Sequence, residues 1–84
     1  MATVVITPEA LRQVERLPFP IQGRVRRIAV RLERWPQVSG AKPLSGNLAG
    51  RYRIRTGDYR LQFHLRGNDV IVEKIGHRRD FYEQ

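Results

Sequence analysis

Hydrophobic and polar residues alternate most regularly over residues 51–66. Arginines at residues 51, 53 and 55 are separated by Tyr52 and Ile54, and the alternation resumes after Gly57-Asp58. Because successive side chains of a strand point to opposite faces, each half of this pattern predicts a strand. Gly-Asp suits a tight hairpin turn, so the two strands are expected to pair. The hairpin should therefore have one apolar face, suited to a core, and one cationic face.

The first part of the chain predicts a strand followed by two helices. Residues 3–6 are a short β-branched run, and Thr7-Pro8 can cap and open a helix that extends over residues 9–17. After Pro18-Phe19-Pro20, apolar residues recur at helical spacing over residues 21–35. Two helices joined by so short a link should form a hairpin that packs on the sheet.

The rest of the chain predicts an irregular connection and a final strand. Residues 36–50 are rich in proline, glycine, serine and asparagine, and Leu44 and Leu48 are expected to anchor them in the core. Residues 67–69 turn the chain into residues 70–76, whose consecutive apolar residues indicate a central strand. The order β-α-α-β-β-β predicts an α+β fold, in which an antiparallel sheet carries the helical hairpin on one face.

Chain length indicates the number of domains, and composition indicates the class of partner. A chain of 84 residues is expected to form one domain, residues 1–84. It has 16 basic residues, fourteen arginines and two lysines, against 8 acidic ones, which gives a net charge of +8. Because arginine pairs bidentately with phosphate and stacks on bases, we expect a nucleic-acid or acidic-protein partner. An arginine-rich proteome is the alternative source of this bias.

Several kinds of site are not expected from this sequence. It has no cysteine, and two histidines are too few for a zinc site, so we expect neither a metal nor a small-molecule cofactor. No apolar run approaches the roughly 20 residues that span a bilayer, and the N-terminal residues lack the pattern of a signal peptide. We therefore expect a cytoplasmic protein that makes no contact with a membrane.

The cationic face of the predicted hairpin is the candidate site. Its polar side chains come from two paired strands and include no acid: Arg53, Arg55, Arg60, Gln62 and His64. A solvated strand face would be expected to mix acids with bases. The C-terminal segment, with His77, Arg78 and Tyr82, can return to this face. RNA could be cleaved here without a nucleophilic side chain, because its own 2′-hydroxyl can attack the neighbouring phosphate.

Four short motifs follow one another in the second half of the chain: Leu44-Ser-Gly, Gly50-Arg-Tyr-Arg-Ile-Arg, Gly57-Asp-Tyr-Arg-Leu and Ile75-Gly-His-Arg-Arg-Asp-Phe-Tyr. With the helical hairpin, they resemble the RelE/ParE toxin superfamily, most closely the RelE-type ribosome-dependent mRNA interferases. The resemblance implies a microbial-RNase-type fold and a toxin that is neutralised by a cognate acidic antitoxin. It also implies cleavage of mRNA in the ribosomal A site, which leaves a 2′,3′-cyclic phosphate and a 5′-hydroxyl and inhibits translation.

The resemblance also suggests which residues act. RelE-type enzymes use two basic residues on the first hairpin strand, an arginine that opens the second, and an arginine and a tyrosine near the C-terminus. The matching residues are Arg53, Arg55, Arg60, Arg78 and Tyr82. The best-known member has lysines at the first two positions, and arginine, with a pKa above about 12, is a poor general base. His77 is therefore the first candidate acid or base, and His64 the second. The residues expected to bind RNA are Arg51, Gln62, His64 and Arg79.

Other functions also fit this sequence. One is a ParE-type poison of DNA gyrase with the same fold and no RNase activity. Another is a non-catalytic basic module that binds RNA or DNA, and a third is an inactive toxin homologue retained as a scaffold. The presence of Arg60 and of the pair Arg78 and Tyr82 favours the ribonuclease.

Overall fold

The computed structural model describes residues 1–81, and the elements follow the predicted order with three additions. The elements are β1 (Thr3–Ile6), α1 (Pro8–Glu15), α2 (Phe19–Leu32), β2 (Lys42–Pro43), η1 (Gly46–Leu48), β3 (Arg51–Thr56), β4 (Tyr59–Arg66), β5 (Asp69–His77) and η2 (Arg78–Phe81). The additions are the short strand β2 and the 3-10 segments η1 and η2. β2 was missed because two residues that include a proline carry no strand periodicity.

The five strands form one mixed sheet in the order β1-β5-β4-β3-β2. Strands β2 to β5 pair antiparallel as predicted, but β1 pairs parallel to β5, with Val4 opposite Val70. The prediction of a wholly antiparallel sheet was therefore wrong at β1. The two helices carry the chain from β1 across one face of the sheet, and β5 then presents its free edge to β1. The α+β class and the central position of β5 are confirmed.

The two helices form the predicted hairpin, and local sequence explains where they begin. The hydroxyl of Thr7 accepts a hydrogen bond from the N–H of Ala10 at 3.1 Å, which caps α1, and Pro8 occupies the first turn. Pro20 lies in the first turn of α2, where a missing N–H costs nothing. Pro18-Phe19-Pro20 therefore separates the helices as predicted, although its last two residues belong to α2.

Removing the cap of α1 should weaken the fold measurably. Thr7→Ala leaves the N–H of Ala10 without its partner and is expected to lower the free energy of unfolding by about 1 kcal/mol. Thr7→Ser retains the hydroxyl and should stay close to wild type. Urea unfolding of the two variants checks this, and equal losses in both would show that the hydroxyl is not the stabilising group.

The core lies between the helices and one face of the sheet. Its largest side chains with almost no exposed surface are Phe63, Leu32, Ile54, Leu61, Val70 and Val72. Phe63 packs against the rings of Trp35 and Tyr52, with ring centroids 5.3 Å away in each case. Leu44 and Leu48 are only half-buried and do not belong to this core. The prediction that they anchor the connection in the core was therefore wrong.

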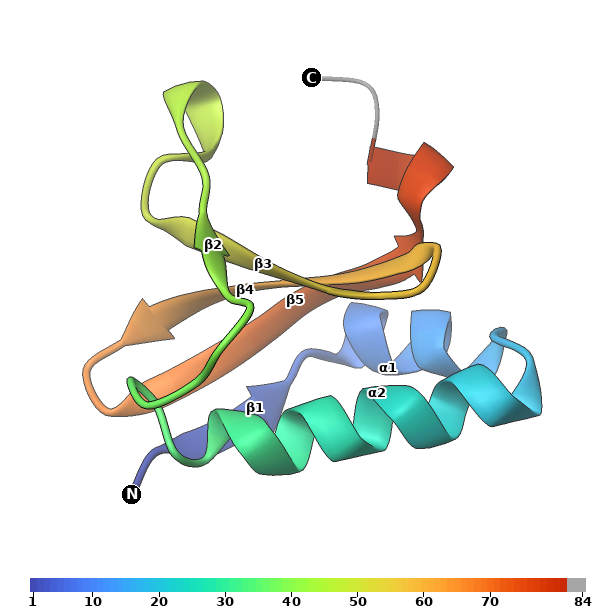
Figure 1. Ribbon diagram of the computed structural model, residues 1–84, viewed down its shortest axis with the longest axis horizontal. Helices are drawn as coiled ribbons and strands as arrows, with labels where there is room; N and C mark the ends of the chain where they lie inside the picture. Colours follow the sequence, from blue (N-terminus) through green and yellow to red (C-terminus); the bar gives the residue numbers. More distant parts are fainter. Residues whose placement is uncertain (82–84) are drawn as a thin grey trace.

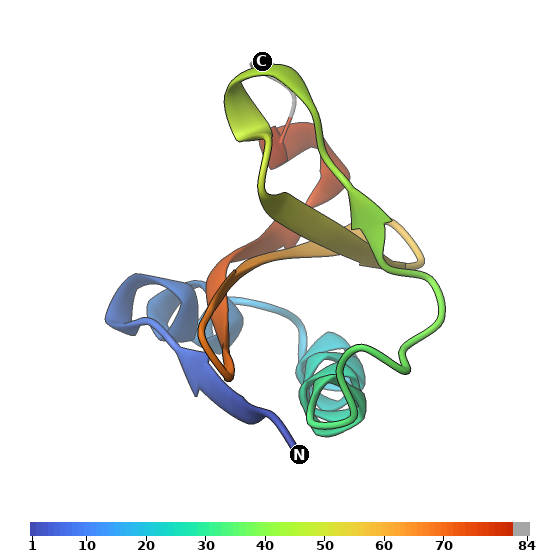
Figure 2. The same ribbon diagram turned by 90° about the vertical axis from the view of Figure 1, so that its left-hand side faces the viewer.

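The opposite face of the sheet is flanked rather than covered. Both helices lie on one side of β3, β4 and β5, whereas the β2–η1 segment and η2 rise from the other side (Figure 1). The turned view shows the same separation and the strong twist of the sheet (Figure 2). Residues of this face, of η2 and of the segment around η1 line one cavity, so the second face forms the floor of a trough between η1 and η2.

Candidate functional site

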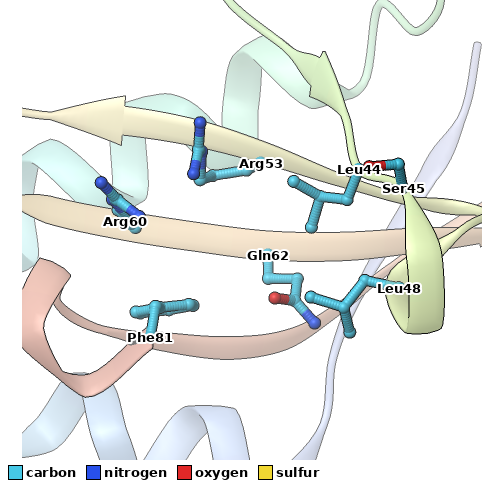
Figure 3. Close-up of a pocket in the computed structure, with 7 residues that line it drawn as sticks. All are labelled: Leu44, Ser45, Leu48, Arg53, Arg60, Gln62 and Phe81. Carbon is cyan, nitrogen blue, oxygen red and sulfur yellow. The ribbon is translucent and has the colours of Figure 1, made fainter. Parts of the chain in front are cut away.

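The trough contains a cavity of about 480 Å³, which we call the arginine cavity (Figure 3). The cavity is lined by residues of β3, β4, η2 and the segment around η1: Arg53, Arg60, Gln62, Phe81, Leu44, Ser45 and Leu48. Arg53 and Arg60 lie at one end, on neighbouring strands, and Leu44 and Leu48 lie at the other (Figure 3). The two leucines thus form a wall of the candidate site, which explains why they are absent from the core.

Strand alternation and register bring two arginines, Arg53 and Arg60, to this cavity and place Arg55 beside them. Arg53 lies opposite Gln62, and Arg55 lies opposite Arg60. Burial, followed by the charges of Arg60 and Arg55, lowers the pKa of Arg53 below its ordinary value. The cationic form of Arg53 is therefore disfavoured by its surroundings, and no acid from the described part of the chain lines the cavity. A bound anion would relieve this repulsion.

Arg60 has a donor that the folded chain leaves unused. Its Nε atom is buried and has no hydrogen-bond partner among residues 1–81. A buried donor without a partner costs free energy, so such groups are uncommon in folded proteins. A phosphate oxygen seated in the cavity is the kind of acceptor that a guanidinium fork binds bidentately.

Gly76 allows the C-terminal segment to fold over the same face. It lies opposite Arg60, and a Cβ atom at this position would be 3.2 Å from Oδ2 of Asp80 and 3.8 Å from the ring of Phe81. Phe81 is buried against the trough, and Nζ of Lys74 lies 4.5 Å from its ring centroid and donates to the carbonyl of Asp80. Because Gly76 has no side chain, η2 can pack closely on β5 and form a wall of the cavity.

Glu73 was missed by sequence reasoning and lies at the centre of a polar network on this face. Its Oε2 accepts hydrogen bonds from Nε of Arg51 and from Nε2 of Gln62, both at 2.8 Å. Its Oε1 lies 2.8 Å from Nδ1 of His64. The two hairpin strands carry no acid on this face, as the sequence indicated, but β5 adds Glu73 to it. Three of the four residues expected to bind RNA are held by one carboxylate.

A β-bulge explains why the sequence concealed Glu73. Gln62 pairs with Lys74 and Phe63 pairs with Val72, so Glu73 is the extra residue in β5. The bulge changes the face on which the following residues lie, and Ile75 is in the core like Val72. Three consecutive apolar residues before Glu73 and the charged Lys74 directly after it gave no alternation from which its face could be inferred. A carboxylate within an apolar strand was the one available signal.

The hydrogen-bond network around Glu73 should make the free energy of unfolding depend on pH. Burial alone would raise the pKa of Glu73, but hydrogen bonds from Gln62 and His64 and the charge of Arg51 outweigh it and lower the pKa. A carboxyl with a lowered folded pKa stabilises the fold above its unfolded pKa of about 4.3, and this contribution is lost as pH falls through the folded pKa. Wild type should therefore be more stable than Glu73→Gln near neutral pH.

Urea unfolding of wild type and Glu73→Gln at a series of pH values checks this prediction. The difference in unfolding free energy should shrink below about pH 4.3. The matched control is Glu15→Gln, the same change at an exposed residue of α1. A difference that stays constant down to the lowest pH would mean that the ionised carboxylate does not stabilise the fold.

The structure places the two candidate histidines on different faces. His77 lies opposite Tyr59, with ring centroids 5.3 Å apart, and lines a separate cavity with residues of α1 on the helical side. Its Nδ1 accepts a hydrogen bond from the N–H of Arg79, which lines the same separate cavity. His77 and Arg79 thus do not lie at the arginine cavity. His64, in contrast, lies on the same face of the sheet as that cavity.

The remaining candidates are Arg78 and Tyr82. Arg78 is exposed at the start of η2 and does not line the arginine cavity, and its N–H donates to the carbonyl of Asp58 at 2.7 Å. Tyr82 lies outside the residues that the structure describes. The catalytic roles of both residues remain predictions.

A second group of arginines adjoins the site at the edge of β3. Arg55 is exposed and lines a cavity of about 340 Å³ with arginines of α2: Arg24, Arg27 and Arg31. It also lines a smaller cavity with Lys42 and Arg53. Arg55 therefore connects the arginine cavity with a cationic stripe along α2.

Two other findings concern residues 1–81 alone. No helix in this range is long and apolar enough to cross a membrane. No three histidine, aspartate or glutamate residues in the same range are grouped so that they could hold a metal ion.

Comparison with known proteins places the chain among toxins. A family model described as the ParE toxin of a type II toxin-antitoxin system, parDE, matches residues 4–82. Toxin RelG of Mycobacterium tuberculosis is 35% identical over 85 residues, which cover 98% of this chain and 97% of that protein. The similarity therefore extends over nearly the whole length of both proteins.

Solved structures show the same architecture. The toxin-antitoxin complex RelBE2 from Mycobacterium tuberculosis contains a chain that is 34% identical, with a TM-score of 0.81 over 92% of this chain and 98% of that chain. The isolated RelE toxin of E. coli has a TM-score of 0.75 over 92% of this chain and 84% of its own. At 17% identity, the second likeness shows the fold alone.

Proposed function

This chain belongs to the RelE/ParE superfamily of type II toxins, as its motifs indicated, and we propose that it acts as a ribonuclease that cleaves mRNA in the ribosomal A site. The observation that carries this proposal is the cavity where, among residues 1–81, Arg53 and Arg60 meet without an acid and Nε of Arg60 has no hydrogen-bond partner. A phosphodiester is the ligand whose charge and oxygen atoms match these groups.

The proposed reaction uses the nucleophile that RNA itself provides. The 2′-hydroxyl attacks the adjacent phosphorus, the bond to the 5′-oxygen breaks, and a 2′,3′-cyclic phosphate and a 5′-hydroxyl result. Negative charge increases on the phosphate oxygens in the transition state, where preorganised donors are most effective. Arg60 would hold the scissile phosphate, and Arg53 and Arg55 would neutralise its charge. Arg78 and Tyr82 would complete the site from the C-terminal segment.

Dependence on the ribosome follows from what the cavity lacks. Its lining contains arginines, an amide, a serine and apolar groups, and arginine is a poor general base. Alignment of the 2′-hydroxyl with the phosphate therefore has to come from elsewhere, and a ribosome-bound codon supplies a fixed backbone geometry.

We also propose a cognate acidic antitoxin as the partner. The structure of RelBE2 is that of a toxin-antitoxin complex, and this chain carries a net charge of +8. Complementary charge speeds the association of two proteins and selects the correct partner. An acidic segment laid across the trough would cover Arg53 and Arg60 and would block access of RNA.

A second function is favoured by one observation. The family model that matches this chain is described as ParE, whereas toxin RelG and the RelBE2 complex carry RelE-type names. A poison of DNA gyrase on the same fold is therefore the alternative, followed by a non-catalytic RNA-binding module.

Expression of the chain alone in bacteria separates these functions. The ribonuclease should stop translation and fragment mRNA while plasmid supercoiling stays unchanged in the first minutes. Loss of supercoiling with intact mRNA would identify a gyrase poison. Growth without either effect would identify a non-catalytic module.

A further inference from the structure

The two histidines differ in what holds them and in what they face. The Nδ1 atom of His64 lies 2.8 Å from Oε1 of Glu73, and the His64 side chain is 33% exposed. His77 lies on the helical side of the sheet, where its Nδ1 accepts the N–H of Arg79. Of the two rings, that of His64 lies on the face of the arginine cavity and is oriented by a carboxylate.

Glu73 fixes the proton arrangement of the His64 ring. Hydrogen bonds from Gln62 and His64 and the charge of Arg51 keep the carboxyl of Glu73 ionised at neutral pH despite its burial, since its pKa is lowered. An ionised carboxylate only accepts hydrogen bonds, so Nδ1 of His64 must carry the proton that it shares with Oε1. The other ring nitrogen, Nε2, then holds a free lone pair when the ring is neutral.

The register of the sheet places the His64 ring two residues along β4 from Gln62, which lines the arginine cavity. Arg53 lies opposite Gln62, and His64 follows Gln62 on the same face of β4, about 7 Å further along the strand. The attacking 2′-hydroxyl and the scissile phosphorus belong to one nucleotide step. A scissile phosphate held by Arg60 and Arg53 beside Gln62 would have its 2′-hydroxyl on the side of the His64 ring.

We infer that His64 accepts the proton of the attacking 2′-hydroxyl and that Glu73 acts as a positioning residue for it; the inference rests on the ribonuclease function proposed above. The proton moves from O2′ to Nε2, and the electron pair of O2′ forms the new bond to phosphorus. The P–O5′ bond breaks, and the 5′-oxygen takes a proton from water or from the imidazolium. The positive charge on the ring during this step is balanced by Glu73.

Arg51 and Gln62 hold the carboxylate of Glu73 in place. Both bind Oε2 of Glu73, so the carboxylate cannot rotate without breaking two further hydrogen bonds. The charged groups that face the ring are Glu73 from β5 and Arg51 from β3. Removing Glu73 should therefore change both the orientation of His64 and the pH dependence of cleavage.

Single-turnover cleavage of mRNA on programmed ribosomes, followed over a range of pH, tests the inference. His64→Ala should slow cleavage at least 100-fold, the range expected for loss of a general base. Added imidazole should partly restore its rate. Glu73→Gln should slow cleavage and shift the pH profile, whereas Glu73→Asp should recover part of the rate. Glu15→Gln is the matched control, and circular dichroism confirms that each variant is folded.

Each outcome has a defined meaning. Wild-type protein that leaves ribosome-bound mRNA intact would reject the proposed ribonuclease and, with it, the role of His64. An active wild type whose His64→Ala variant cleaves equally fast would reject the role of His64 alone. A large loss in His77→Ala with none in His64→Ala would identify the other ring as the base. An unchanged pH profile in Glu73→Gln would limit Glu73 to a structural part and overturn its positioning role.

Discussion

Replacing Arg60 by alanine is expected to abolish toxicity and to slow mRNA cleavage about 100- to 1000-fold, the usual cost of removing one preorganised donor from a transition-state site. The guanidinium has a buried Nε without a hydrogen-bond partner in the described part of the chain and lies beside Arg53 at one end of the cavity. Its removal breaks no hydrogen bond or ion pair that we find among residues 1–81, and it relieves repulsion on Arg53. Thermal stability should therefore stay close to wild type.

Arg66→Ala provides the matched control for this experiment. Arg66 is an exposed arginine at the far end of the same strand and does not line the arginine cavity. Growth after induction and the cleavage rate on ribosomes should both resemble wild type in this variant. A folded Arg60→Ala protein that remains fully toxic would remove the basis for the catalytic assignment and favour the gyrase alternative.

The largest effect on stability is expected at Phe63. This side chain has no exposed surface and packs between the rings of Trp35 and Tyr52, so Phe63→Ala leaves a cavity at the centre of the core. Such changes cost about 3–5 kcal/mol. A domain of this size has a total stability of about 5–15 kcal/mol, so the variant should be close to unfolding at 37 °C.

Urea unfolding at 25 °C measures this loss directly. Leu65→Ala, two residues along the same strand and 36% exposed, is the control and should change the free energy of unfolding far less. Similar losses in the two variants would contradict the assignment of Phe63 to the centre of the core.

Local sequence patterns were sufficient for the hairpin and its arginine face. The alternation from Arg51 to Arg66 predicted β3, β4 and the side on which Arg53 and Arg60 lie, because strand periodicity depends on neighbouring residues alone. The cap of α1 by Thr7 followed from equally local chemistry. The family relationship was also recognisable, since its motifs are short continuous segments.

Features that depend on distant pairing or on irregular backbone could not be predicted in this way. The parallel pairing of β1 with β5 joins residues more than sixty positions apart, and no local pattern specifies it. The bulge at Glu73 changes the side on which His77 lies, so counting along β5 places the histidine incorrectly. Leu44 and Leu48 were assigned to the core because apolarity does not distinguish a core position from the wall of a cavity.

The central claim is that this chain cleaves mRNA on the ribosome, and purified components test it most directly. The protein is incubated with ribosomes that hold a defined codon in the A site, and with the same mRNA alone at physiological salt. We predict rapid cleavage within the A-site codon, with a 2′,3′-cyclic phosphate and a 5′-hydroxyl at the new ends, and little cleavage of the naked RNA. Intact mRNA on the ribosome, or equally fast cleavage of naked RNA, would contradict it.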